Sequence, residues 1–481
     1  MKTQTKLLIA AIATAVGFGY QASGMLDGEE KIERNRFPNI ILILCDNIGY
    51  GDLKVFNPEA RQNTPHISQL ASEGMVFHHA YAAAPCCTPS RAAVMTGSYP
   101  RRVGLDLADE SQRPVLFPAS NWGLHPNEKT VAKILKECGY ATMCIGKWHL
   151  GDQPVFLPTR HGFNHFFGIP YSDDMGRVEA GRPPLPLMRD EKVIEAPVDA
   201  NLLTQRNTEE ALLFIEKNQN QPFFLYLSHI TPGSAPKQPV SPDFRGLSGN
   251  GTWGDSVIEL DWSTGQIMDK LSELGLTEKT LIIWTNDNGA PGNRHHASNL
   301  PLRGAAYSVN EGGMRVPFIA RWPGRIIAGA ESTELITLMD LLPTFAALCG
   351  GKLPDHKIDG YNILPLLLGY PGSSSPYEAF AYYYVDQLQA VRAGDWKLYL
   401  PLQRKRTGFG RHSTRFEGEL FNLIEDPLQE DDLFDQRPDV VKQLLSYADS
   451  FRKDLGELGV VGQNVRPVGF VEEASPRLLG K

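Results

Sequence analysis

The stretch that decides the fold is NIILILCDN, residues 39–47, in which an unbroken apolar run ends directly in polar residues. A short continuous apolar run of this kind is typical of a β-strand that is covered on both faces. Three more runs share the pattern: ATMCI (141–145) before GKWH, FFLYL (223–227) before SH, and LIIWT (281–285) before NDN. The four runs predict the buried strands of one sheet.

Helical patterns lie between these runs. SQLASEGMVFHHA (68–80) follows Thr64 and Pro65, and NEKTVAKILKECG (127–139) ends at Gly139 as a C-cap would. The alternation predicts an α/β fold with a mostly parallel central sheet sandwiched by helices. Ligands in such sheets bind outside the carboxyl ends of the strands, so we expect the four polar clusters to converge there.

The alternation fades after residue 324, and a last helix-like stretch at 334–351 closes the large domain. We expect a large domain over residues 36–350, a Pro/Gly/Ser-rich linker over 351–376 and a smaller α+β domain over 377–481. In the smaller domain, short strands precede a helix from about residue 438 to 455, which predicts an antiparallel sheet with one helix packed on it.

The first 24 residues place Lys2 and Lys6 before an apolar run and then small residues. This order predicts a secretory signal peptide at 1–24, and hence export to the periplasm or the medium; the alternative is a buried N-terminal helix. No later segment has transmembrane length, so we expect no stable membrane insertion. Six cysteines are too few for a disulfide scaffold, although one pair, such as Cys138 with Cys144, could form a bridge.

The composition and net charge limit the kinds of partner that the protein is expected to bind. The 481 residues are 42% hydrophobic and 21% charged, as in soluble globular proteins. A formal net charge of −8 offers no basic field for nucleic acid, so we expect no nucleic-acid partner. An anionic substrate must therefore be held by a local cluster of residues.

One such cluster lies in CTPSRAAVMTG, residues 87–97. Pro89 suits the first turn of a helix and Gly97 its end, so Cys87 is expected at the helix N-terminus, where anions bind. Arg91, one turn further, adds a planar cation that matches an oxyanion such as sulfate or phosphate. A lone cysteine in this position is more often an ordinary buried residue than a nucleophile.

The spacing Cys-x-Pro-Ser-Arg resembles the signature of the type I sulfatases, in which a maturation enzyme oxidises the first cysteine to formylglycine. The register selects Cys87 and not Cys86. Further segments match in order: NIILILCDNIGYGDL, GKWHLG, WTNDNG, EGGMRVPFIARWPG and, near the C-terminus, GDWKLY with ELFNLIEDP. FLPTRHGFNHFFGIPYSDDMG is similar to the arylsulfatase A and N-acetylgalactosamine-6-sulfatase branch. The resemblance implies an alkaline-phosphatase-like sulfatase fold.

The resemblance also implies a metal site at the strand ends. Asp46, Asn47, Asp287 and Asn288, with the group made from Cys87, would hold one divalent cation, and hard oxygen ligands suit calcium rather than zinc. Either pair alone would be interpreted as a turn or a helix cap. Asn47 stands where the family more often has Asp, which removes one negative charge.

The mechanism that the resemblance implies begins with the aldehyde at position 87, which hydrates to a gem-diol whose oxygen attacks sulfur. The metal, Arg91 and Lys147 would neutralise the sulfuryl oxygens. His149 would help to deprotonate the second hydroxyl so that sulfate is expelled, and Ser172 would lie near the sulfate. The alternatives are a solvated face for Lys147 and a structural role for His149.

Two positions depart from the family pattern. Gly233 aligns where a histidine normally contacts the leaving-group oxygen, and Ala306 aligns where a lysine normally contacts sulfate. Five other residues are candidates to replace them: His229, His295, His296, Lys237 and Arg303.

We therefore expect an exported, calcium-dependent sulfatase that hydrolyses aryl or carbohydrate sulfates. One alternative is a pseudo-sulfatase that binds sulfated glycans without turnover. Another is a phosphatase or phosphonate hydrolase of the same fold, for which the additional Asp and His metal ligands are not found after WTNDNG.

Overall fold

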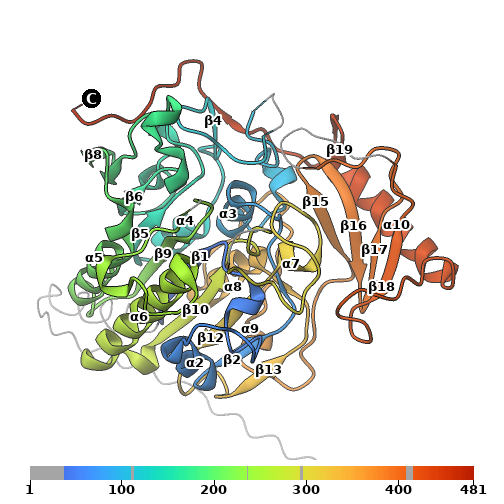
Figure 1. Cartoon of the computed structure of the whole chain (residues 1–481), viewed down its shortest axis with the longest axis horizontal. Coiled ribbons are helices and arrows are strands. Elements are labelled where there is room, and N and C mark those ends of the chain that lie inside the picture. The colour runs from blue at the N-terminus through green and yellow to red at the C-terminus, as the bar shows by residue number, and fades with distance from the viewer. Residues whose placement is uncertain (1–36, 110–112, 236, 293–295, 408–414, 481) are drawn as a thin grey trace, which may run out of the picture. The chain divides into compact units, whose positions relative to one another are not determined.

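The computed structural model describes residues 37–480 except 110–112, 236, 293–295 and 408–414 (Figure 1). The predicted signal peptide, residues 1–24, lies outside this part of the chain. No helix among the described residues combines the length and the apolar character that crossing a membrane requires.

The central sheet confirms the four predicted strands. β1 (Asn39–Asp46) lies between β10 (Thr280–Asn286) and β9 (Phe223–Pro232), and β5 (Ala141–Lys147) pairs with β9. All three pairings are parallel; Ile40, for example, aligns with Leu281 on one side and Phe224 on the other. The carboxyl ends of these strands therefore meet at one edge of the sheet, as predicted.

Further strands, in parallel and antiparallel pairings, complete this ten-stranded sheet at its two sides. On one side lie β6 (His165–Ile169), β7 (Leu187–Arg189) and β8 (Lys192–Glu195), and on the other β12 (Phe318–Arg321), β2 (Met75–Phe77) and β13 (Ala330–Ser332). β6 continues the parallel centre beside β5, whereas the β7–β8 hairpin and β12 run antiparallel to their inner neighbours.

Helices cover both faces of the sheet, as the apolar pattern of β1 requires. Ile41 and Ile43 pack with the face covered by α2 (Pro65–Ser72), α5 (Leu203–Lys217) and α6 (Gly251–Glu273). Ile40, Leu42 and Leu44 pack with the face covered by α3 (Cys87–Thr96), α4 (Val131–Glu137) and α8 (Leu341–Cys349). Each fully buried aliphatic side chain contributes about 1.5–3 kcal/mol, so the two layers fix the register of the central strands.

Two helical predictions extend too far. The pattern at residues 68–80 ends as a helix at Ser72, and its second half is strand β2, because Val76 pairs with Ile319 of β12. Gly74 makes the change possible, since a Cβ there would lie 2.4 Å from the Ala320 carbonyl oxygen. In the stretch 334–351, the helix starts only at Leu341, because Ile336 and Thr337 form strand β14.

The proposed pairing of Cys138 with Cys144 is wrong. Cys144 is buried in the middle of β5, whereas Cys138 is the C-cap of α4 and lies against the end of α8. The nearest thiol to Cys138 is that of Cys349, with 2.6 Å between the two sulfur atoms. All six cysteines are free thiols in the structure.

The C-terminal part has the predicted antiparallel sheet and helix. β15 (Phe380–Tyr384), β16 (Gln387–Ala393), β17 (Trp396–Tyr399) and β18 (Glu419–Asn422) pair in chain order. α10 (Pro438–Leu455) packs its apolar side on them through residues such as Val441 and Leu444.

The remaining strands and α-helices of the described residues are short. They are β3 (Ala80–Tyr81), β4 (Trp122–Gly123), α7 (Glu311–Met314), β11 (Arg315–Val316), β14 (Ile336–Thr337), α9 (Leu364–Leu367), β19 (Gly456–Glu457), β20 (Val460–Val461) and β21 (Gly469–Phe470).

A buried ion pair connects the C-terminal sheet to α7. Lys397 of β17 donates to Glu311 Oε1 at 2.7 Å and to the Val309 carbonyl at 2.8 Å, and both charged side chains are fully buried. Although burial raises the pKa of Glu311, Lys397 and the two nearby guanidinium groups of Arg315 and Arg392 lower it to about 2. Further along the chain, β21 pairs with β4, which belongs to the N-terminal half.

Candidate active site

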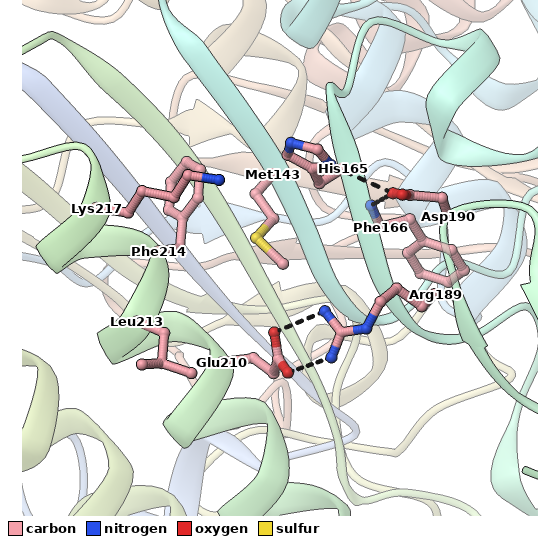
Figure 2. Close-up of a pocket in the computed structure, with 9 residues that line it drawn as sticks. All are labelled: Met143, His165, Phe166, Arg189, Asp190, Glu210, Leu213, Phe214 and Lys217. Carbon is pink, nitrogen blue, oxygen red and sulfur yellow. Dashed lines mark hydrogen bonds and ion pairs between the residues drawn. The ribbon is translucent and has the colours of Figure 1, made fainter. Parts of the chain in front are cut away.

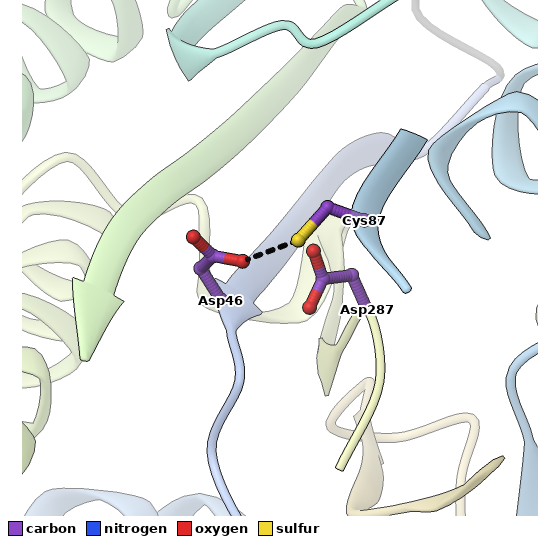
Figure 3. A group of neighbouring side chains, drawn as sticks. All are labelled: Asp46, Cys87 and Asp287. Carbon is purple, nitrogen blue, oxygen red and sulfur yellow. Dashed lines mark hydrogen bonds between the residues drawn. The ribbon is translucent and has the colours of Figure 1, made fainter. Parts of the chain in front are cut away.

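The structure brings the predicted metal and nucleophile residues together at the carboxyl edge of the sheet (Figure 3). Asp46 ends β1, Asp287 directly follows β10, and Cys87 is the first residue of α3. One ligand atom from each of the three lies within 4.8 Å of the others, and all three residues are buried. The convergence that the strand ends predicted is therefore present.

The twin cysteines point to different places. Cys86 has extended backbone angles and precedes α3, which ends at Gly97 in the left-handed region, so the predicted helix is confirmed. The Cys87 thiol donates to Asp46 Oδ1 at 3.3 Å, as Figure 3 shows, whereas the Cys86 thiol faces the Pro114 carbonyl at 3.7 Å. Burial, with the negative charge of Asp46, raises the pKa of the Cys87 thiol, which stays protonated.

The donor set fits a divalent cation. Two carboxylates, Asp46 and Asp287, face a common point. Asn288 Oδ1 is buried and has no hydrogen-bond partner among the described residues, while Asn288 Nδ2 donates to Asn47 Oδ1 at 2.5 Å. Asn47 in turn donates to Ser234 Oγ at 2.7 Å. Two carboxylates with an unsatisfied amide oxygen are ligands of the kind that calcium and magnesium prefer.

Arg91 binds the protein's own groups. Its Nε and Nη2 atoms donate to Asp287 Oδ2 at 3.0 and 2.8 Å, and Nη1 donates to the Lys147 carbonyl at 3.1 Å and to Ser228 Oγ. The guanidinium is fully buried, and Nη2 lies 3.6 Å from Asp46 Oδ1. In this arrangement Arg91 positions the two carboxylates; its predicted contact with sulfate stays a prediction.

Lys147 places a cation at the centre of the site. Its Nζ lies 2.7 Å from Asp46 Oδ2 and 3.4 Å from Ser172 Oγ. Burial lowers the pKa of Lys147, but the charge of Asp46 outweighs it and the net shift is upward, so the ammonium keeps its proton. Burial likewise raises the pKa of Asp46, and the cations Lys147 and Arg91 reverse this to a net decrease. The site therefore holds ionised groups of both signs out of water.

His149 is held as a neutral imidazole with one free lone pair. Its Nε2 lies 3.0 Å from the Leu116 carbonyl, which can only accept, so Nε2 carries the hydrogen. Nδ1 is then a bare acceptor, and it is buried with no partner among the described residues. Burial and the charge of Lys147 lower the pKa of His149. The ring can accept a proton from a group that enters the site.

Most of the candidates proposed to replace the missing histidine and lysine are engaged elsewhere. His229 Nε2 lies 3.2 Å from Ser263 Oγ on α6, and Arg303 pairs with Glu419 at 3.1 Å. His296 lies against Gly251 at the start of α6, and Lys237 is exposed. His295 lies outside the described residues.

The structure adds a residue that the sequence reasoning missed, Asp173. It is buried, and the Ser172 hydroxyl donates to its Oδ1 at 3.4 Å. Burial, with the charges of Asp174 and Asp46, raises the pKa of Asp173 to about 7, against the opposing effect of Lys147. Its position directly after Ser172 was the signal that could have found it.

One departure from the family pattern, Gly233, lies next to these carboxyl groups, and the other, Ala306, precedes a residue near Cys87. Gly233 has a φ of 74°, and a Cβ there would lie 3.4 Å from Asp173 Oδ1 and 3.8 Å from Asp46 Oδ2. Ala306 precedes Tyr307, whose φ of 62° is uncommon for a bulky residue. Burial raises the pKa of the Tyr307 phenol, and the neighbouring Cys87 adds to this shift. Tyr307 thus lies near the nucleophile position.

A separate cleft of 310 Å³ lies away from this edge (Figure 2). It is lined by Met143 and Phe166 from the amino-terminal halves of β5 and β6 and by residues of α5. Two pairs of its polar groups contact each other, Arg189 with Glu210 and His165 with Asp190, and Lys217 also lines it. The cleft therefore has a different chemistry from the cluster around Asp46.

Comparisons with known proteins agree with this geometry. The model of the family described as sulfatase matches residues 38–351, and that described as N-sulphoglucosamine sulphohydrolase, C-terminal, matches residues 307–453. Dog (Canis lupus familiaris) N-acetylgalactosamine-6-sulfatase is 39% identical over 379 residues, which cover 75% of this chain and 71% of the relative. Human (Homo sapiens) arylsulfatase A is 39% identical over 393 residues, covering 76% and 75%.

Solved structures have the same architecture. The PsFucS1 sulfatase from Pseudoalteromonas sp. superposes with a TM-score of 0.76 and 27% identity, covering 88% of this chain and 91% of that one. Ps i-CgsB in complex with k-i-k-neocarrahexaose superposes with a TM-score of 0.74 and 28% identity, covering 86% and 92%. The fold is shared along most of each chain.

Proposed function

The chain belongs to the sulfatase family and is a sulfuric ester hydrolase, and from this we propose that it converts aryl or carbohydrate sulfates to an alcohol and inorganic sulfate. The observation that carries the proposal is the position of Cys87. It begins α3 and points at Asp46, with Asp287 and the Lys147 ammonium beside it. Such a cluster of buried charges can stabilise a transferring sulfuryl group.

We propose that a maturation enzyme converts Cys87 to formylglycine and that the hydrated aldehyde is the nucleophile. His149 Nδ1, the bare acceptor described above, would take a proton from the second hydroxyl so that sulfate is released. Lys147 and Ser172 would hold the sulfuryl oxygens, because both side chains are buried next to the nucleophile position.

We propose that the metal is a single calcium ion. Asp46, Asp287 and Asn288 would hold it, together with Asn47 and the group at position 87. When bound, the cation would supply charge neutralisation for the sulfuryl oxygens. The support for this assignment is the oxygen-rich donor set and the unsatisfied Asn288 Oδ1.

We favour sulfated carbohydrates as the substrate class. We also propose that the protein is exported to the periplasm or the medium. One structural relative is described in complex with k-i-k-neocarrahexaose, and another is described in connection with the metabolism of multiple glycosaminoglycans. The N-terminal segment with the charge order of a signal peptide supports export.

The alternatives receive less support. A pseudo-sulfatase would account for Gly233 and Ala306, but the buried, charged groups around Cys87 are those that turnover requires. A two-metal phosphatase needs a second cation site. Among the described residues, three or more Asp, Glu, His or Cys side chains come together for a metal in one place, at Asp46, Cys87 and Asp287. A second site of this kind is not found in that part of the chain.

The direct test is ion chromatography of the sulfate that the purified, matured protein releases from aryl sulfates and from sulfated oligosaccharides. We expect release from both classes. Failure to release sulfate from any ester, by protein whose aldehyde at position 87 is verified by mass spectrometry, would contradict the proposed function.

Calcium is expected to stabilise the folded protein. At roughly 100 times its dissociation constant, the ion should add about 2.7 kcal/mol to the free energy of unfolding, because it binds the folded state alone. Urea unfolding after chelation, with and without added calcium, measures this difference. Asp287→Asn removes a ligand charge and should reduce the effect, whereas Asp190→Asn, far from the site, should not. An equal calcium effect in the wild type and Asp287→Asn would show that the ion binds elsewhere.

A further inference from the structure

We propose that Asp173 is the general acid that protonates the leaving alcohol oxygen, an inference that rests on the proposed sulfatase activity. Sulfate esters of sugars have poor leaving groups, so a proton must reach the bridging oxygen as its bond to sulfur breaks. Among the described residues, Asp173 is a buried carboxyl group next to Ser172 for which the proposed mechanism has no role.

Asp173 lies at the far end of the site from Cys87. Four contacts connect them in series: Cys87 Sγ to Asp46 Oδ1 at 3.3 Å, Asp46 Oδ2 to Lys147 Nζ at 2.7 Å, Lys147 Nζ to Ser172 Oγ at 3.4 Å, and Ser172 Oγ to Asp173 Oδ1 at 3.4 Å. Lys147 thus lies between the nucleophile and the carboxyl group. In-line displacement places the leaving oxygen on the side of sulfur opposite to the nucleophile. A sulfuryl group held by Lys147 would present its bridging oxygen toward Asp173.

Gly233 leaves the carboxyl group uncovered on one side. The closest side-chain atom to a Cβ at Gly233 would be Asp173 Oδ1 at 3.4 Å, followed by Asp46 Oδ2 at 3.8 Å. The φ of 74° and the Ile230 carbonyl at 2.7 Å both oppose a side chain there. The backbone at Gly233 therefore lies against Asp173 without a side chain that would separate the carboxyl group from a ligand.

The surroundings of Asp173 favour its protonated form. Burial is the main cause that raises its pKa, the negative charges of Asp174 and Asp46 add to this effect, and the positive charge of Lys147 opposes it. With a pKa of about 7, the carboxyl group holds a proton in neutral and acidic solution. The other carboxylates of the site are paired with cations: Asp46 with Lys147, and Asp287 with Arg91. Among the described residues, Asp173 is the carboxyl group of this cluster that has no ion-pair partner, and it accepts a hydrogen bond from the Ser172 hydroxyl instead.

The proposed step balances without a further reactant. The proton on the Asp173 carboxyl moves to the bridging oxygen, the sulfur–oxygen bond breaks, and its electron pair stays on that oxygen. The products are a neutral alcohol and an Asp173 carboxylate, which takes up a proton from water. No group is oxidised or reduced.

The test compares leaving groups in Asp173→Asn. For a sugar or alkyl sulfate, kcat/KM should fall on the order of 10²- to 10⁴-fold, the contribution of a general acid. For 4-nitrophenyl sulfate the loss should be much smaller, because nitrophenolate leaves without a proton. The wild-type rate with the sugar sulfate should decrease as pH rises through about 7, since the protonated carboxyl group is the active form. That decrease should disappear in Asp173→Asn.

Two further variants separate catalysis from a structural effect. Asp173→Glu keeps the acid and should recover part of the sugar-sulfate turnover that Asp173→Asn loses. Asp174→Asn keeps Asp173 but removes a negative neighbour, which lowers the pKa of Asp173, so the decrease in rate should move to lower pH. Equal losses for both leaving groups in Asp173→Asn, or a pH profile that Asp174→Asn does not shift, would overturn the proposal. Absence of turnover in the matured wild type would instead contradict the sulfatase function on which the proposal rests.

Discussion

Replacement of Cys87 by alanine is expected to abolish sulfate release, with a decrease in kcat of about 10⁶-fold, as when a covalent nucleophile is removed from a hydrolase. Cys87 is the residue of α3 whose side chain enters the space between Asp46 and Asp287. Alanine leaves no atom there that could be oxidised to an aldehyde or attack sulfur. The assays are sulfate release by the purified variant and mass spectrometry of the peptide that contains position 87.

The neighbouring cysteine is the matched control. Cys86→Ala removes a thiol from the adjacent position, but that thiol faces the Pro114 carbonyl and not the carboxylates. This variant should retain the aldehyde at position 87 and a rate near that of the wild type. Unchanged sulfate release by Cys87→Ala, or an aldehyde at position 86, would contradict the assignment of the nucleophile.

Replacement of Arg91 by methionine is expected to destabilise the protein by about 3–5 kcal/mol, the cost of leaving a buried charge without its partner. Arg91 donates twice to Asp287 and also binds the Lys147 carbonyl, and both charged side chains are fully buried. Methionine fills a similar volume but offers no donor. Urea unfolding in the presence of a chelator measures the loss of free energy.

Two variants show whether this loss reflects the buried pair. Arg91→Lys keeps the charge but lacks the planar fork that contacts several acceptors at once, so we expect an intermediate loss. Arg160→Met breaks an exposed pair with Glu191 and should cost less than about 1 kcal/mol. Wild-type stability in Arg91→Met would show that the carboxylates do not depend on this guanidinium. Added calcium should restore part of the loss, because it compensates the charge of Asp287.

The central sheet could be predicted from the sequence because its strands are buried on both faces. Ile40 and Ile41 face opposite helical layers, so both are apolar, and the run stops where β1 reaches the polar edge. The carboxyl ends of parallel strands meet at one edge of a sheet, so the sequence also predicted that Asp46, Lys147 and Asp287 lie together. Where an element's pattern was ambiguous, as at residues 68–80, the prediction failed: β2 pairs with β12, about 240 residues further along the chain, and local periodicity does not contain that contact.

The details of the site depended on long-range contacts in the same way. Arg91 was predicted to contact sulfate, which stays a prediction, but its contact with Asp287, 196 residues away, could not be predicted from the motif. Asp173 had no motif of its own, and its elevated pKa results from burial and from Asp174 and Asp46. The positions of Asp46, Lys147 and Asp287 could therefore be predicted from the strand ends. The protonation state of Asp173 could be inferred only from the packed structure.

The ion pair between Lys397 and Glu311 limits how this chain can be divided. Glu311 begins α7, four residues after Tyr307, and its charge is balanced partly from the C-terminal sheet. A truncated protein that stops in the predicted linker would keep Glu311 but lose both Lys397 and Arg392. Recombinant fragments and chimeras of such enzymes should therefore exchange α7 and the C-terminal sheet together, because Glu311 and Lys397 form a buried ion pair although they are 86 residues apart in the chain.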